Sequence, residues 1–467
     1  MATRMMDEGQ RRGGLRAGAL GAPALLFLVM AFQAPLTSAA GNVPLLVGLG
    51  NGVGAPAAFV LCGIVLTFFA VPFAAMSRRI TNAGAFYSYV SAGIGKPAGA
   101  AAGWVALFTY NVLLLVPVAY TGIFGASIFK AEIGIDLPWQ VYSLGILVVV
   151  WLIGMRGIEL NTVLLSIFLV LEVAILISTV VAILFKDGLT GAAFAPNNVF
   201  SGNFGLGFMF AILSFIGFEA TAVFGEETRD PKKTVARATF AAVWAIVGIY
   251  GLSTWASVSI HPADKVSEYA LEHADTYMGD AVIHGLGGWS SHAFNWLLLV
   301  SLLACCMAVH NMASRYLYAF GRDGMLPASL SRTHPKFATP YVASSVQALL
   351  MIIIVVICSL SGADPYTTLA ALAGGFATVG VLVLMLTTLV AAVFFLRSTE
   401  EALWVRIVAP VLAFAGLGTV LVIILRNFDT LAGASTFSSL LPWAFPAIGV
   451  LGYIHGRVVG REVNLAT

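Results

Sequence analysis

Charged residues are scarce in this chain. They make up 10% of its 467 residues, whereas about a quarter of a soluble domain is charged. The 4 cysteines all fall in apolar stretches, and none has a spacing to histidine that suits a metal site. This composition argues against a soluble domain, a disulfide scaffold or a zinc protein. It predicts a chain surrounded by membrane lipid, with no metal, no cofactor and no nucleic-acid partner.

Apolar runs take the place of the missing charge. A helix needs about 20 apolar residues to cross a bilayer, and segments of that length recur along the whole chain. We place twelve of them, at 18–48, 54–77, 97–127, 139–156, 160–185, 204–226, 238–260, 293–320, 342–362, 366–396, 404–425 and 437–456. The sequence therefore predicts an all-α integral membrane protein with twelve transmembrane helices.

The positions of the basic residues orient these helices. With the N-terminus in the cytoplasm, the inner loops hold 20 lysines and arginines and the outer loops hold 4. Cytoplasmic loops are enriched in basic residues, so this asymmetry supports the count of twelve. We expect both termini to be cytoplasmic, with residues 1–17 as a cytoplasmic tail. The predicted location is the inner (cytoplasmic) membrane, and no cleavable signal peptide is evident.

Two of the predicted helices carry residues that interrupt a helix. Segment 1 contains Pro35 among small and polar residues, and segment 6 contains Gly217 next to Glu219. Backbone groups freed at a break in lipid need partners, so breaks survive beside a cavity or another helix. The two breaks are five helices apart, which predicts two inverted repeats, and broken helices at corresponding positions indicate a transport site. The alternative is a pair of independent kinks.

The repeats define the expected organisation of the chain. Residues 18–186 form the first inverted repeat (helices 1–5), and residues 187–396 form the second (helices 6–10). Residues 397–467 supply two peripheral helices, 11 and 12, and a cytoplasmic tail.

Three stretches resemble the amino acid–polyamine–organocation (APC) superfamily of permeases. The stretch TNAGAFYSYVSAGIGKPAGAAAGW (81–104) resembles the family's linker into helix 3. SFIGFEATAVFGEETRDPKKTVARAT (214–239) resembles its helix 6 signature, and RYLYAFGRDGMLPASLSRTHPKFATP (315–340) resembles the inner end of helix 8 and the following loop. The resemblance implies a core of two five-helix inverted repeats that takes up or exchanges amino acids, amines or polyamines.

The resemblance also suggests residues of helix 6. Glu219 matches a glutamate of the arginine/agmatine antiporter, and Leu213 stands where the family has a gating tryptophan. A nearby aromatic residue, Phe210, Phe215 or Phe218, is then the candidate cap over the substrate. Glu219 itself has three open roles: it holds the helix broken, binds a substrate amino group, or titrates during transport.

The predicted substrate site centres on the break in helix 1, where backbone N–H groups at a helix N-terminus suit a carboxylate. The candidate substrate-binding residues are Gln33, Ala34, Pro35, Leu36, Thr37, Ser38, Tyr110, Phe210, Phe215, Gly217, Phe218 and Glu219. Two alternatives remain open here. The hydroxyls of Thr37 and Ser38 cap the break itself, or Tyr110 is a core residue with a satisfied hydroxyl.

The candidate proton-coupling residues are Glu172, Glu219 and His310. A charge in the hydrocarbon region is costly, so an acid there indicates function. Certain proton-coupled APC permeases have a lysine at the position that aligns with Glu172, where sodium-coupled relatives bind sodium. Glu172 alternatively serves as a hydrogen-bonded structural peg or a cation ligand, and His310 as a packing residue.

These observations favour a secondary active transporter for an amino acid or a related small amine. We expect alternating access by proton-coupled symport, with a proton favoured over sodium. An amino acid, amine or polyamine exchanger is the alternative, and a non-transporting sensor or a channel is the alternative of a different class. No motif of an enzyme is found, and the sequence does not indicate an oligomeric state.

Overall fold

The computed structural model describes residues 21–80, 85–156, 162–223, 230–337, 339–428, 430 and 441–465. Every regular element within these ranges is a helix, as predicted. The longer helices are α2 (Ala22–Gln33), α3 (Pro35–Leu45), α4 (Ala55–Ser77), α6 (Lys96–Ile133), α7 (Trp139–Arg156), α8 (Thr162–Lys186), α10 (Phe204–Leu213), α12 (Pro231–Ile246), α13 (Leu252–Ser259), α15 (Tyr277–Leu286), α16 (Trp289–Arg322), α17 (Tyr341–Leu360), α18 (Leu372–Leu396), α19 (Ala409–Arg426) and α22 (Ala444–Leu465).

Shorter helices connect or extend these. The α-helical ones are α5 (Ala85–Gly93), α9 (Pro196–Val199), α11 (Ala220–Val223) and α14 (Val266–Glu272). Single π-helical stretches are η1 (Leu46–Asn51), η5 (Val247–Gly251), η7 (Pro365–Ala371) and η8 (Trp404–Val408), and the 3₁₀ turns are η2 (Gly52–Gly54), η3 (Gly191–Phe194), η6 (Ala328–Ser331) and η9 (Leu441–Trp443). The sequence did not predict the helices α5, α9, α14 and α15, because they lie in loops without a long apolar run.

Nine helical stretches in the described part are long and apolar enough to cross a membrane. Two shorter apolar helices, Ala22–Gln33 and Phe204–Leu213, belong to predicted segments 1 and 6. Each of the twelve predicted segments is mainly helical where it is described, apart from the interruptions in segments 1 and 6, while residues 18–20, 160–161, 224–226 and 437–440 lie outside the described residues. The all-helical prediction is confirmed, and the number of twelve crossings stays a prediction.

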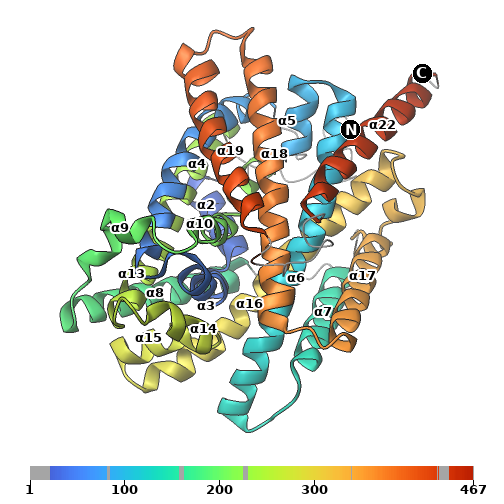
Figure 1. The fold of residues 1–467 in the computed structure, drawn as a ribbon. Helices are drawn as coiled ribbons and strands as arrows, with labels where there is room; N and C mark the ends of the chain where they lie inside the picture. Colours follow the sequence, from blue (N-terminus) through green and yellow to red (C-terminus); the bar gives the residue numbers. More distant parts are fainter. Residues whose placement is uncertain are drawn as a thin grey trace, which may run out of the picture.

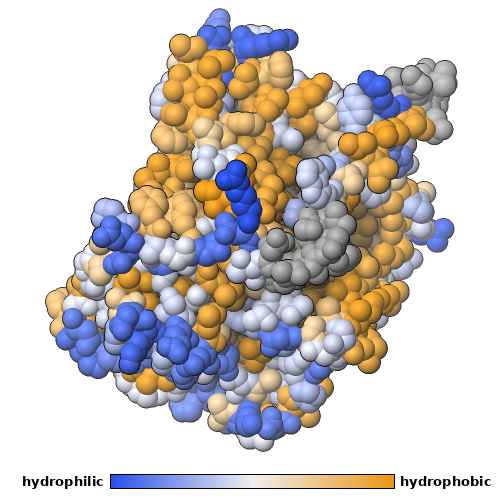
Figure 2. Space-filling view, viewed as in Figure 1, coloured by the Kyte–Doolittle hydropathy of each residue, from blue (hydrophilic) through white to orange (hydrophobic). Residues whose placement is uncertain are grey.

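The helices pack around α6, which has 38 residues and is therefore about 57 Å long. Figure 1 shows α6 running through the molecule beside α18, with α2, α3 and α10 near the centre and α7 beside α17. Figure 2 shows hydrophobic residues spread over the sides formed by α17, α18 and α19, while hydrophilic residues gather at two opposite ends. This distribution suits a protein whose sides face lipid.

Helix 1 is interrupted where the sequence places Pro35. Helix α2 ends at Gln33, and Ala34 takes a left-handed conformation with φ of 45° before α3 begins at Pro35. Ala34 is the one residue other than glycine with positive φ among the described residues, so the backbone here is strained. Proline suits the first position of a helix because its missing N–H would have no partner there.

Helix 6 is interrupted between α10 and α11. The turn over residues 214–219 contains Gly217 with φ of 115°, a conformation that favours glycine. The side-chain amide of Gln33 donates to the carbonyl of Phe215 at 2.9 Å. The two breaks therefore lie side by side, and one satisfies a backbone group that the other leaves free.

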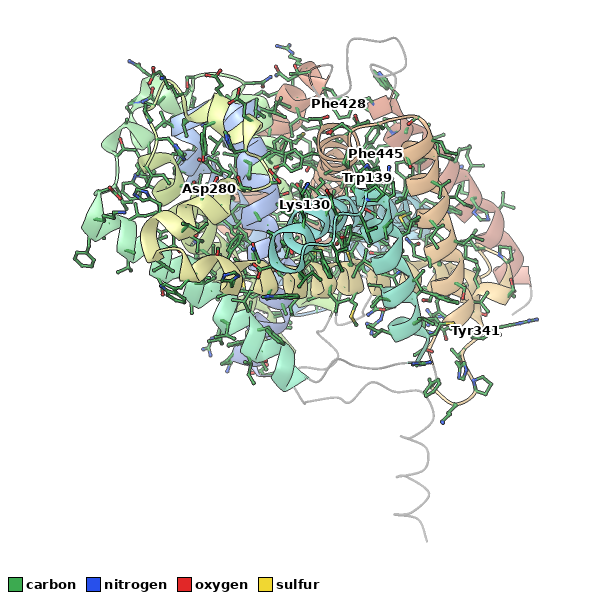
Figure 3. All side chains as sticks on the ribbon, turned by 90° about the horizontal axis from the view of Figure 1, so that it is seen from below. Lys130, Trp139, Asp280, Tyr341, Phe428 and Phe445 are labelled. Carbon is green, nitrogen blue, oxygen red and sulfur yellow. The ribbon has the colours of Figure 1, made fainter. Side chains whose placement is uncertain are left out.

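A hairpin of α14 and α15 covers the end of helix 1 beyond α3. Ser267 donates its hydroxyl to the carbonyl of Val47 at 3.2 Å, and this contact seats α14 on η1. Within the hairpin, Tyr269 donates to Asp280, and burial together with this bond raises the pKa of Tyr269 to about 12. Figure 3 looks onto this end of the molecule, where Lys130 and Trp139 mark the adjoining ends of α6 and α7 and Asp280 marks α15.

Candidate functional site

A small cavity lies where the two breaks meet. Its volume is about 40 Å³, and a water molecule needs about 10–15 Å³ of such space, so it holds about three water-sized groups. The lining comes from broken helix 1, α6, broken helix 6 and α16. Its 13 residues are Phe32, Gln33, Thr37, Ser38, Asn42, Leu113, Val116, Pro117, Tyr120, Leu213, Ile216, Cys305 and Val309. None of these side chains carries a formal charge at neutral pH.

Helix 1 supplies most of the polar groups of this lining. Asn42 donates its amide to the hydroxyl of Ser214 at 3.0 Å and accepts a hydrogen bond from the Tyr120 hydroxyl at 2.8 Å. Ser38 donates to the carbonyl of Gln33 at 2.9 Å, across the break. These bonds join helix 1 to α6 and to the turn of helix 6 through side chains that face one cavity.

Glu172 of α8 reaches the first turn of α3. Its Oε2 accepts hydrogen bonds from the backbone N–H of Leu36 at 3.2 Å and from the hydroxyl of Ser301 at 2.8 Å. Ser301 of α16 in turn accepts the backbone N–H of Thr37 at 3.2 Å. The carboxyl is 4% exposed, and it lies at the positive end of a helix, where a negative charge is stabilised.

This arrangement gives partners to the backbone N–H groups at the predicted carboxylate seat of helix 1. The N–H groups of Leu36 and Thr37 are not free for a substrate carboxylate, because Glu172 and Ser301 already accept them. Ser38 donates its N–H to the carbonyl of Ala34, and Pro35 has none. The first turn of α3 is therefore fully satisfied by the protein itself.

Glu219 accepts a hydrogen bond from a backbone N–H group within the break of helix 6. It is completely buried, and its two oxygens accept the N–H of Gly217 at 2.8 Å and the hydroxyl of Tyr110 at 2.9 Å. The Tyr110 ring stacks on Tyr316 of α16, with ring centroids 5.5 Å apart. These contacts join α6, α16 and helix 6 on the side of the cavity that faces away from the α14–α15 hairpin.

Two tyrosines close the opposite side of the cavity, toward the α14–α15 hairpin. Tyr366 of η7 donates to the carbonyl of Gly41 at 2.9 Å, and Tyr120 bonds the neighbouring residue Asn42. A methyl group at Gly41 would overlap the ring of Tyr120, so glycine is required for this close approach. From α6, Tyr120 thus lines the cavity and contacts helix 1, while Tyr110 contacts the break of helix 6 without lining the cavity.

His310 lies at a different interface. Its Nε2 is 2.9 Å from the hydroxyl of Ser344 on α17, and its Nδ1 is buried without a protein partner. The ring is 1% exposed, and Val309 rather than His310 lines the cavity. His310 is thus separate from the cluster that contains Glu172.

The cavity takes up only part of the predicted substrate site. Gln33, Thr37 and Ser38 line it. The other predicted residues are buried nearby or within the breaks and are not among the lining residues: Ala34, Pro35, Leu36, Tyr110, Phe210, Phe215, Gly217, Phe218 and Glu219.

The aromatic residues predicted to cap the substrate, Phe210, Phe215 and Phe218, do not line the cavity. Phe215 packs against Phe59 of α4 at 6.3 Å, and Phe218 packs against Phe69 of α4 at 5.9 Å between ring centroids. Phe210 is fully buried in the apolar core. The turn in helix 6 directs Leu213 and Ile216 to the cavity instead, and helix 1 adds Phe32.

Several residues of the site were missed in the sequence. Ser301 interrupts the apolar run LLLVSLLACC, and a polar residue in such a run was the available signal. Tyr120 lies ten residues after Tyr110 in the same predicted helix, and it offered the same signal, a hydroxyl within an apolar run. Nothing in the sequence distinguishes Leu113, Val116 or Val309 from lipid-facing aliphatic residues.

The chain was compared with known proteins. Residues 40–437 match the profile of a family described as Amino acid permease. The Branched-chain amino acid permease BcaP of Lactococcus lactis subsp. cremoris (strain MG1363) is 27% identical over 308 residues, which cover 61% of this chain and 64% of that relative. The Low-affinity putrescine importer PlaP of Escherichia coli (strain K12) is 25% identical over 305 residues, 63% of this chain and 65% of that relative.

A third relative is the Serine/threonine exchanger SteT of Bacillus subtilis (strain 168). It is 23% identical over 303 residues, which cover 64% of this chain and 68% of the relative. The chain thus spans less than two thirds of BcaP and of PlaP. The relatives thus include a branched-chain amino acid permease, a putrescine importer and a serine/threonine exchanger.

Proposed function

The chain belongs to the amino acid permease family, and we propose that it is a secondary transporter that carries an amino acid or a related small amine across the cytoplasmic membrane by alternating access. One observation carries this proposal. The breaks of helices 1 and 6 meet at a cavity whose polar lining is held by hydrogen bonds between separate helices. Helix breaks beside a cavity near mid-membrane are typical of transporter binding sites.

The proposed architecture has twelve crossings with both termini in the cytoplasm. Helices 1–5 (18–186) and 6–10 (187–396) would form the two inverted repeats, and helices 11 and 12 would be peripheral. The adjacency of the two breaks supports this arrangement, because equivalent helices of inverted repeats meet near the centre of such folds. The α14–α15 hairpin then lies on the outer side, and the side of Glu219 and Tyr110 faces the cytoplasm.

Proton coupling is proposed to run through Glu172. As an anion, Glu172 occupies the N-terminus of α3, the position at which a helix would otherwise hold a substrate carboxylate. Protonation removes the charge and weakens both hydrogen bonds. A substrate carboxylate could then accept the Leu36 N–H and the Ser301 hydroxyl in place of Glu172, so that proton and substrate favour each other's binding. Such positive coupling is the thermodynamic requirement of symport.

The two closures along α6 supply the gates that alternating access requires. Tyr120 and Tyr366 would part from Gly41 and Asn42 to open the outer side. On the inner side, Tyr110 would part from Glu219. In the described structure the tyrosine contacts on both sides are formed.

Counterflow in proteoliposomes tests the proposal. Vesicles loaded with unlabelled substrate should accumulate labelled substrate transiently; a channel shows no such stimulation and a sensor shows no flux. An imposed proton gradient then separates symport, which accumulates substrate from empty vesicles, from the alternative of obligatory exchange. The native thiol of Cys305 adds a direct measure of the site, because bound substrate should protect it from a thiol reagent. The Cys305→Ser variant identifies that signal.

A further inference from the structure

The ionisable side chains buried near the cavity all form hydrogen bonds with other parts of the protein. Among the described residues, the buried side chains that can ionise within the helix bundle as acids or as histidine are Glu172, Glu219 and His310. None of the three lines the cavity. Both carboxylates already accept two hydrogen bonds each, from α3 and Ser301 or from Gly217 and Tyr110.

The absence of a charged side chain from the lining restricts the charge of the substrate, because a charge buried without a partner is strongly disfavoured. A diamine or a basic side chain would bring one or two uncompensated positive charges into a cavity with no carboxylate in its lining. An α-amino acid has no net charge, and its ammonium and carboxylate partly compensate each other. The remaining hydrogen bonds can come from amides, hydroxyls and backbone groups.

The lining also divides into two kinds of surface. Helix 1 presents the amides and hydroxyls of Gln33, Thr37, Ser38 and Asn42. The parts contributed by α6, helix 6 and α16 are mainly aliphatic, for example Val116, Ile216 and Val309. A polar head directed toward helix 1 and a short apolar tail directed toward the other helices would match both surfaces.

We infer that the substrate is a small neutral α-amino acid with a short uncharged side chain, of the alanine to leucine class, and not a diamine or a basic amino acid. The inference rests on the proposed function and narrows it. The mainly aliphatic surfaces of α6, helix 6 and α16 favour an uncharged side chain, because a second ammonium group directed there would have no charged partner. Of the relatives' named substrates, branched-chain amino acids carry no net charge, in keeping with this uncharged lining, whereas putrescine carries two positive charges.

The wild-type protein decides the question directly. Alanine, valine and leucine are compared with arginine and putrescine by thermal shift of the purified protein and by counterflow. We expect counterflow of at least one neutral amino acid to exceed that of arginine and putrescine by about tenfold or more. Preferred transport of arginine or putrescine would overturn this inference and leave the proposed function intact. Absence of flux for the whole panel, with folded protein, would overturn both.

A single isosteric change tests whether the lining sets this selectivity. Asn42→Asp places a carboxylate in the cavity, where Tyr120 can still donate to it and Ser214 can turn to donate as well. We expect this variant to bind arginine or putrescine at least about tenfold more tightly than the wild type does. Asn427→Asp, near the end of α19, adds the same charge away from the lining and should change nothing.

A folded Asn42→Asp protein with unchanged cation affinity would show that the lining charge does not determine the substrate class, and would contradict the inference. If this variant does not fold, the wild-type panel decides alone.

Discussion

Glu172 acts as a helix cap supplied from another helix. The residue at the N-cap of α3 is Ala34, whose side chain makes no capping hydrogen bond, so the first turn depends on Glu172 and Ser301. Both bonds to Glu172 use its oxygen as an acceptor, and the side-chain carbonyl of glutamine can accept them as well. The structural and the titrating roles of this residue can therefore be separated by one substitution.

We expect Glu172→Gln to keep counterflow and to lose accumulation driven by a proton gradient. At about 150 mV one proton supplies about 3.5 kcal/mol, which can sustain about 300-fold accumulation of a neutral substrate. Uptake into proteoliposomes with and without an imposed gradient measures the loss, and Glu132→Gln at the outer end of α6 is the matched control. If the variant still concentrates substrate under a proton gradient alone, Glu172 is a structural peg and His310 becomes the next candidate.

Glu219 lends itself to a different pair of substitutions. Glu219→Leu leaves the Gly217 N–H and the Tyr110 hydroxyl buried without partners, which costs about 1–3 kcal/mol each. Glu219→Gln can keep both bonds, since its carbonyl accepts the Gly217 N–H and its amide donates to Tyr110. We expect lower thermal stability and impaired binding and transport in the leucine variant, and retained substrate binding with an altered pH profile in the glutamine variant. A leucine variant with the melting temperature of the wild type would contradict the capping role. A wild-type pH profile in the glutamine variant would show that ionisation of Glu219 is irrelevant.

At the scale of elements, α6 carries Tyr110 and Tyr120, the tyrosines of the two proposed gates. Tyr110 and Tyr120 are ten residues apart, and their hydroxyls bond helix 6 on one side and helix 1 on the other. Gly41 is the point of closest approach, since the Tyr120 ring occupies the space of a side chain there. In the proposed mechanism, movement of α3 relative to α6 on the side of the α14–α15 hairpin begins at this contact.

A methyl group at Gly41 should hold the outer closure apart. We expect Gly41→Ala to make Cys305 react faster, by about tenfold, with a membrane-impermeant thiol reagent added from outside. Gly248→Ala is the matched control, because nothing lies within 4 Å of the methyl group it adds. A labelling rate equal to that of the wild type would show that Tyr120 does not close the outer side.

The elements also show what sequence reasoning can predict. Pro35 and Gly217 act locally on the backbone, so both breaks were predictable to within a residue or two. The identity of the lining was not, because the direction of a side chain depends on the turn after α10 and on the packing of α4. Thus Phe215 and Phe218, the conspicuous aromatics, pack on α4, while the plain aliphatic residues Leu213 and Ile216 face the cavity.

At the scale of the whole molecule, helix 1 takes part in each proposed step: proton binding, substrate binding and gating. Glu172 and Ser301 hold the N-terminus of α3, Tyr120 and Tyr366 hold its middle, and the α14–α15 hairpin holds its outer end through Ser267. In the proposed mechanism, protonation of Glu172 biases the other contacts of helix 1. Coupling between a proton site and a gate needs such an element with two arrangements.

The orientation of the whole molecule yields the last prediction. The hairpin region 261–292 and the loop 322–336 lie on opposite sides of the membrane in the proposed topology, which rests on the 20 to 4 asymmetry of basic residues. Glu268 and Lys336 are exposed, so cysteines placed there should be accessible without disturbing packing. We expect Glu268→Cys to react with an impermeant thiol reagent on intact cells, and Lys336→Cys to react only after the membrane is opened. Labelling of Lys336→Cys from outside would contradict the topology and, with it, the inverted repeats and the inner and outer closures assigned along α6.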